Sequence, residues 1–231
     1  MIGLAAAAAV FVLIHLLVSG TGLRGAIVGA IGERPYMGLF ALASAAALVW
    51  LGFAFAGARH GPDPTYWSAT PATKWAQLAV TFLAFLLLVP GLLTPNPTSV
   101  RQEGWLDRSE AVRGVLRITR HPFLWGVALW AAGHLMVNGD EAGMILFGSL
   151  LALAILGTVS IDGKRRRALG DKWTAFASQT SNIPFGAVVA GRQRLQLGEI
   201  GWWRLAMGVV VWGSLVWVHP LAFGVSPIPG R

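Results

Sequence analysis

Histidines inside apolar runs are the residues of this sequence that could carry chemistry. The stretch from Arg117 to Asp140 opens on Arg120-His121-Pro122 and continues as an apolar helix in which His134 is the only ionisable group. His15 has a similar place in the first apolar run. An unpaired polar group inside an apolar span costs free energy. We therefore expect each imidazole to have a bound partner, either a metal or a hydrogen-bonding group.

A neutral imidazole is the commonest metal ligand in proteins and also holds haem iron. The pattern is therefore compatible with a bis-histidine haem b, and equally with histidines that each bind a backbone carbonyl. His121 and His134 are separated by roughly 220° around one helix, so they cannot both be ligands of the same iron. We interpret His121 as a helix cap, beside which Arg120 could bind an anion.

The composition indicates a protein embedded in a membrane. Of the 231 residues, 55% are hydrophobic and 12% are charged, and the mean hydropathy is +0.62. The N-terminal apolar run has no basic residue ahead of it and no small-residue cleavage site, so we expect a first span and not a removed signal. Without cysteine, disulfides, thiolate chemistry and Cys-ligated clusters are excluded.

Apolar runs of about 20 residues recur along the chain, and each can cross a bilayer. We predict an all-α polytopic helix bundle of about six transmembrane helices, forming a single membrane domain over residues 1–231. The expected spans lie at about Ile2–Gly20, Tyr36–Ala58, Trp75–Leu93, His121–Val137, Ala142–Ile161 and Ile200–Val218.

The basic residues indicate how these spans are oriented. With these boundaries, 15 of the 18 Lys and Arg residues fall on one side of the membrane. The positive-inside rule assigns that side to the cytoplasm and both termini to the outside, as in a multi-pass protein of a bacterial inner membrane. The net charge of +8 is thus a topology signal. A nucleic-acid site needs a basic groove with stacking aromatics, and none is evident, so no nucleic acid is expected as a partner.

Other functional classes lose support as well. No acidic residue falls inside a predicted span, which disfavours proton-relay pumps and cation-coupled transporters. P-loop and HExxH motifs are absent. Outside the spans, Arg108–Arg117 is typical of a surface helix or of a solvated loop, and Gly163–Thr180 of a helix on an anionic leaflet. Asn138–Glu141 is predicted to form the outer turn of an antiparallel hairpin.

Several motifs together resemble the signature of the NnrU family, which includes the 15-cis-ζ-carotene isomerase of plants and cyanobacteria. The resemblance covers roughly Ile14 to Gln193. It is carried by Thr119-Arg120-His121-Pro122-Phe123-x-x-Gly126 with Trp130, His134 and Asn138-Gly139, by His15, Ser19-Gly20, Arg24 and Ile31-Gly32-Glu33-Arg34-Pro35-Tyr36 with Phe40, and by Thr180-Ser181-x-Ile183-Pro184-Phe185.

The resemblance implies a membrane protein that, in the isomerase branch, binds haem b through two histidines and isomerises a cis double bond of a carotenoid without net redox change. Those ligands match His15 and His134, which would be both the metal ligands and the catalytic residues. Arg120 and His121 would shape the cytoplasmic opening beside the haem propionates or another anion. In the bacterial branch the family name is associated with nitrite and nitric oxide metabolism (denitrification). The implied substrate is an apolar membrane molecule; the oligomeric state is left open.

The depth of the two histidines leaves a second pairing open. On the predicted spans His15 lies near mid-membrane, and His134 lies about 10 Å further toward the outside. Helix tilt or a kink at Pro122 could close that gap. If neither does, His15 and His121 form the closer pair.

A second resemblance, to membrane isoprenylcysteine carboxyl methyltransferases, implies an alternative cofactor. In those enzymes this region binds S-adenosylmethionine, and Arg120 and His121 would bind it here. They usually carry Tyr where Leu124 stands, and a Glu after the following span where this chain has Asp162. The likeness is carried by Arg120-His121-Pro122-x-x-x-Gly126, Arg165-Arg166, Gly170, Trp173 and Pro184-Phe185.

Overall fold

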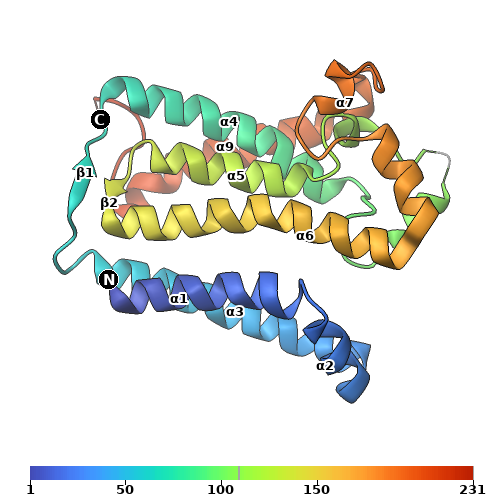
Figure 1. Ribbon diagram of the computed structural model, residues 1–231. Helices are drawn as coiled ribbons and strands as arrows, with labels where there is room; N and C mark the ends of the chain where they lie inside the picture. Colours follow the sequence, from blue (N-terminus) through green and yellow to red (C-terminus); the bar gives the residue numbers. More distant parts are fainter. Residues whose placement is uncertain (109, 231) are drawn as a thin grey trace.

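Long helices laid side by side make up most of the computed structural model, which describes residues 1–108 and 110–230 (Figure 1). In chain order the elements are α1 (Ile2–Leu13), η1 (Ile14–Val18), α2 (Leu23–Ile31), α3 (Glu33–Ala58), β1 (Thr65–Trp67), α4 (Pro71–Leu93), η2 (Glu103–Asp107), η3 (Gly114–Arg117), α5 (Pro122–Leu135), β2 (Gly139–Asp140), α6 (Glu141–Gln179), α7 (Gly186–Val189), α8 (Leu197–Ile200) and α9 (Trp202–Phe223).

Four helices, α3, α4, α6 and α9, are long and apolar enough to cross a bilayer. A fifth span results if α1 with η1 and α2, which are bent by 78° relative to each other, count as one broken span. The helix α5 has 14 residues, fewer than the roughly 20 that a full crossing needs. The all-α membrane bundle is therefore confirmed, whereas the count of six spans and the orientation of the termini stay predictions.

The helices form two layers joined along α6. One layer holds α1 and α3, and the other holds α4, α5 and α9 (Figure 1). The layers meet in an apolar cluster that brings α1 and α3 against the start of α6. Its buried residues are Leu4, Ala7, Ala8, Leu51, Ala58 and Ala142. Small side chains in this cluster allow the helix backbones to approach closely.

Glycines allow the tightest contact, between α4 and α5. A Cβ added to Gly91 would lie 2.7 Å from the backbone nitrogen of Phe123, and one added to Gly126 would lie 2.7 Å from the Leu88 side chain. The Pro122 ring occupies the first turn of α5, where a missing N–H costs nothing. This close contact holds the His121-Pro122 corner against the last turn of α4.

One end of the bundle carries the two short strands, and we call it the strand end (residues 59–70 and 136–141). Here Thr65 and Trp67 pair antiparallel with Asp140 and Gly139. Asp140 also caps α6 by accepting a hydrogen bond from the Gly143 backbone N–H at 2.7 Å. The first and the last described residues of the chain lie at this end (Figure 1).

The opposite end, the loop end (residues 94–121 and 162–201), carries most of the basic residues. The predicted span Ala142–Ile161 and the predicted basic helix form one 39-residue helix, α6, which breaks at Gly170 with φ 51°. Over Arg108–Arg117 the chain forms loop and the short 3-10 turn η3, so a continuous surface helix is absent among its described residues. Ser109 lies outside the described residues.

Candidate functional site

His134 lies in the last turn of α5 among aromatic rings. Its ring stacks on Phe147 of α6 with 4.7 Å between centroids and lies 4.6 Å from Trp130. Its Nδ1 donates a hydrogen bond to the backbone carbonyl of Trp130 at 2.9 Å. Because a carbonyl oxygen can only accept, Nδ1 carries the proton and Nε2 keeps a free lone pair.

His15 has the same arrangement in a different helix. It lies in η1, a π-helical turn, which is a rare conformation that often occurs at functional sites. Its Nδ1 donates to the carbonyl of Phe11 at 2.7 Å, so its Nε2 also keeps a lone pair. The ring lies 4.6 Å from Phe11 and 5.4 Å from Phe40 of α3.

The two imidazoles have different neighbours, and no hydrogen bond or ring contact joins them among the described residues. His134 contacts α6 at the level of Phe147, whereas the end of η1 reaches α6 at Lys164, whose Nζ bonds Ser19 at 3.2 Å. α6 lies between α1 and α5 (Figure 1). Each imidazole alone would suit a metal ligand, since metal-bound histidines usually donate their other N–H to a carbonyl or carboxylate. A shared iron between the two rings stays a prediction from the sequence.

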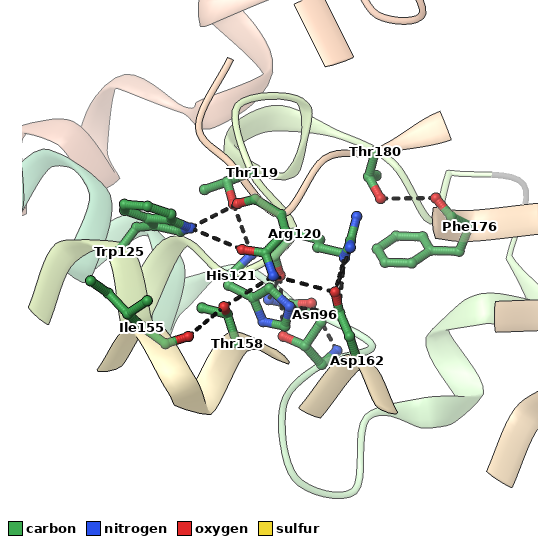
Figure 2. A network of polar contacts seen from close by, with 12 residues as sticks. Asn96, Thr119, Arg120, His121, Trp125, Ile155, Thr158, Asp162, Phe176 and Thr180 are labelled. Carbon is green, nitrogen blue, oxygen red and sulfur yellow. Dashed lines mark hydrogen bonds and ion pairs between the residues drawn. The ribbon is translucent and has the colours of Figure 1, made fainter. Parts of the chain in front are cut away.

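Arg120 and His121 do lie together, and both bind Asp162 of α6 (Figure 2). The Nε of Arg120 donates to the two carboxylate oxygens at 2.9 and 3.1 Å, and Nη2 also bonds Oδ2. The Nε2 of His121 donates to Oδ1 at 2.7 Å. The Asp162 side chain is 13% exposed. A nearly buried carboxylate therefore takes up the donors that were predicted to bind a cofactor anion.

One nitrogen of His121 has no partner. The residue is 2% exposed, and its Nδ1 is buried without a hydrogen bond among the described residues. Since Nε2 donates to Asp162, Nδ1 is an acceptor, and a buried unsatisfied acceptor costs about 1–3 kcal/mol. The His121 imidazole is thus held in one tautomer by Asp162, with its other nitrogen facing the protein interior.

A remote segment of the chain, residues 180–185, holds this corner in place. The backbone N–H of Arg120 donates to the Ser181 carbonyl at 2.9 Å. The Asn182 carbonyl accepts from the hydroxyl of Thr119 at 2.5 Å and from the indole of Trp125 at 2.7 Å. The Asn182 side chain donates to Asp162 Oδ2 at 3.3 Å. The segment therefore bonds both to α5 and to the carboxylate.

The loop that follows α4 supports the corner from a third direction. Asn96 and Thr98 donate to the carbonyl of Arg120 at 3.1 and 3.2 Å. Asn96 is 3% exposed, and its own backbone N–H bonds Gln102 at 2.6 Å. Three segments far apart in the sequence thus meet at Arg120.

The roles of Asp162 and Asn182 were not predicted from the sequence. Asp162 is the first acidic residue after the apolar part of α6. The hairpin turn at Asn138–Glu141 brings that part of α6 beside the start of α5. Pairing the two ends of the predicted hairpin would have placed Asp162 opposite Arg120 and His121.

A second ion pair at the loop end anchors α8 and the start of α9. The Nε and Nη2 of Arg117 donate to the two carboxylate oxygens of Glu199 at 2.7 and 2.9 Å. The backbone N–H of Gly114 also donates to Glu199, at 2.8 Å. The bond from Arg117 is the largest cause that holds the pKa of Glu199 below its usual value, against a smaller opposing effect of burial.

A cavity of about 610 Å³ opens at the loop end, away from these histidines. Its lining includes Arg108, Lys172 and Phe176, and none of His15, Arg120, His121 or His134. Among the described residues, no group of three or more His, Asp or Glu side chains is arranged to hold a metal ion.

Comparison with known proteins places these residues in a sequence family. The profile of the family described as NnrU protein matches residues 3–227. The chain is 27% identical over 168 residues to the chloroplastic 15-cis-zeta-carotene isomerase of Zea mays and 26% identical over 166 residues to that of Arabidopsis thaliana. Each match covers 71% of this chain and 45% of the relative, so the chain spans about half the length of these relatives. No solved structure matches the chain.

Proposed function

Since the chain belongs to the NnrU family, we propose that it acts in a membrane as a cis–trans isomerase of an apolar polyene of the carotenoid class. The curated relatives are 15-cis-zeta-carotene isomerases, which supports a substrate with conjugated double bonds. The observation that carries the proposal is the pair His15 and His134. Each imidazole keeps Nε2 free among aromatic rings within the apolar part of the bundle.

The proposal includes haem b as the cofactor, with His15 and His134 as its ligands. Haem would supply an iron centre able to interact with the polyene, and rotation about a double bond transfers no atoms or electrons overall. The carbonyls of Phe11 and Trp130 orient the two imidazoles by accepting their Nδ1 protons. In this arrangement the Nε2 atoms of both imidazoles would have to reach the same iron.

The protein's own residues supply an apolar, aromatic setting for such a substrate. Trp130 and Phe147 flank His134, and Phe147 is 7% exposed. Rings of this kind pack well against a flat conjugated chain. A cationic or strongly polar substrate would lose its hydration there without gaining partners.

Arg120, His121 and Asp162 have a positioning role in this proposal. Their mutual bonds fix the start of α5 against α6, and α5 carries His134 one helix length away. The methyltransferase alternative would require Arg120 and His121 to contact S-adenosylmethionine, and both side chains are bound to Asp162 instead. A bacterial inner membrane and a role in nitrite or nitric oxide metabolism stay predictions from the sequence.

An absorption spectrum of the detergent-purified protein tests the cofactor, and conversion of a cis-carotene in liposomes tests the reaction. We expect a Soret band and isomerisation that are both lost in His15→Ala and in His134→Ala. The exposed loop residue His60 provides the matched control, and His60→Ala should keep both signals. A haem-free protein without isomerase activity, or a Soret band that survives both substitutions, would contradict the proposal.

A further inference from the structure

One face of α6 changes from exposed apolar side chains to arginines at the loop end. Ile155, Leu156 and Val159 are 42%, 50% and 63% exposed. At 100° per residue, positions 155, 156, 159, 163, 166 and 167 lie within about 120° of one another around the helix. We call these six residues the lipid stripe: an apolar half, then Gly163, then Arg166 and Arg167.

The arginines of the lipid stripe have no counter-ion among the described residues. Both are exposed, and neither forms an ion pair with any described carboxylate. Of the two acidic residues nearest along the helix, Asp162 is bound to Arg120 and His121, and Asp171 lies beyond the break at Gly170. A Cβ added to Gly163 would lie 3.6 Å from Nη1 of Arg167, so this guanidinium reaches back toward the apolar half.

Lys164 adds a third cation beside the lipid stripe. It is half-buried, and its Nζ bonds only neutral oxygens, the carbonyl and hydroxyl of Ser19, at 3.2 Å each. The positive charges of Arg165, Arg24 and Arg167 all act on it.

Two of these neighbouring cations are already neutralised. Arg24 pairs with Glu33, and Arg165 pairs with Glu103. This leaves Lys164, Arg166 and Arg167 as three cations without a carboxylate partner among the described residues. The charges of Lys164 and Arg167 act on each other, and an external anion would relieve that repulsion.

We propose that the lipid stripe and Lys164 bind one anionic phospholipid of the adjoining leaflet. Its phosphate would bond the guanidinium groups of Arg166 and Arg167 and the ammonium of Lys164, since guanidinium matches phosphate geometry with two parallel bonds. An acyl chain would lie along the exposed apolar half. Basic residues just outside a membrane helix are attracted to anionic lipids in this way.

A soluble anion would use only half of this surface. Free phosphate could meet the three cations, but it would leave Ile155, Leu156 and Val159 without a partner. In a phospholipid the phosphate and the hydrocarbon are joined in the same order as the basic and apolar parts of the lipid stripe. The surface therefore matches an amphiphile and not a free ion.

The test measures lipid binding to the detergent-purified full chain by native mass spectrometry. Phosphatidylglycerol and phosphatidylcholine with identical acyl chains are compared, and glycerol phosphate is the soluble competitor. We expect phosphatidylglycerol to bind about tenfold more tightly than phosphatidylcholine, and Arg166→Gln/Arg167→Gln to remove that preference. Glycerol phosphate should compete only at far higher concentration.

Two variants separate charge from structure. Arg34→Gln/Arg194→Gln removes the same charge from exposed arginines elsewhere and should keep the preference for phosphatidylglycerol. Arg166→Lys/Arg167→Lys keeps the charge at the lipid stripe and should keep most of the preference. Equal binding of the two lipids, equal competition by glycerol phosphate, or loss of preference in either of these variants would overturn the proposal.

Discussion

His121 and Asp162, 41 residues apart in the chain, are joined by a 2.7 Å hydrogen bond between the start of α5 and the middle of α6. At the other end of the same helix pair, His134 stacks on Phe147. The two helices are therefore fixed against each other at both ends, once by a charged contact and once by an aromatic one. This arrangement determines the depth at which His134 lies.

We expect Asp162→Asn to destabilise the protein by about 3 kcal/mol, because it leaves the largely buried Arg120 cation without its counter-ion. The free energy or midpoint of unfolding in detergent measures the effect. Asp171→Asn, which removes an exposed carboxylate that forms no ion pair with the described residues, is the matched control and should change stability little. Similar losses in the two variants would mean that Asp162 does not hold Arg120 as the structure indicates.

Because Arg117 and Glu199 form an ion pair, we expect the folded protein to lose stability in acid. The pKa of Glu199 in the folded protein is below its usual value of 4.5, mainly through the bond from Arg117. The pair therefore contributes fully above pH 4.5, and its contribution disappears as the pH falls through the lower folded pKa.

Thermal unfolding of the wild type and of Glu199→Gln, followed from pH 7 down to pH 3, measures this contribution. The wild type should be the more stable at pH 7, and the two proteins should converge in acid. A stability difference that stays constant over the whole pH range would show that the charge on Glu199 is not involved.

The close contact at Gly91 leaves no room for a larger side chain between α4 and α5. Gly91→Ala would place a methyl group 2.7 Å from the backbone nitrogen of Phe123, so we expect a loss of about 1–3 kcal/mol from overpacking. At Gly148 of α6 an added Cβ meets nothing within 4 Å. Gly148→Ala should therefore be neutral or slightly stabilising, and the two melting temperatures provide the comparison. Equal melting temperatures would argue against the close helix contact.

The helices could be predicted from the sequence because each one is marked by an unbroken run of apolar residues. Each of the six apolar runs became a helix, and the Asn138–Glu141 turn joins α5 to α6 as expected. The neighbouring placement of Arg120 and His121 also followed from the sequence. α6 exceeds its predicted span because apolarity marks only the part in the membrane, whereas the helix continues to Gln179.

The polar cluster could not be predicted from local patterns. Asp162, Asn182 and Asn96 come from three separate segments. The residues beside each of them in the sequence do not indicate that the three belong to one site. They meet only because the α5–α6 hairpin, the return of the chain after Thr180 and the end of α4 converge on Arg120. Likewise, no local pattern predicts that His15 lies in a π-helical turn, since that conformation depends on how α1 packs.

The π-helical turn has a consequence for the part of the chain that follows it. The backbone N–H of Ser19 bonds the carbonyl of Ile14, five residues back, at 3.1 Å. One surplus residue in a turn offsets every later side chain by about 100° around the axis. The offset thus affects which residues after Val18 meet α6, where Ser19 bonds Lys164 and a Cβ added to Gly20 would lie 3.0 Å from the Ser160 hydroxyl oxygen. In this helix, the number of residues before Ser19 therefore helps to decide which side chains face α6, as their apolar character does.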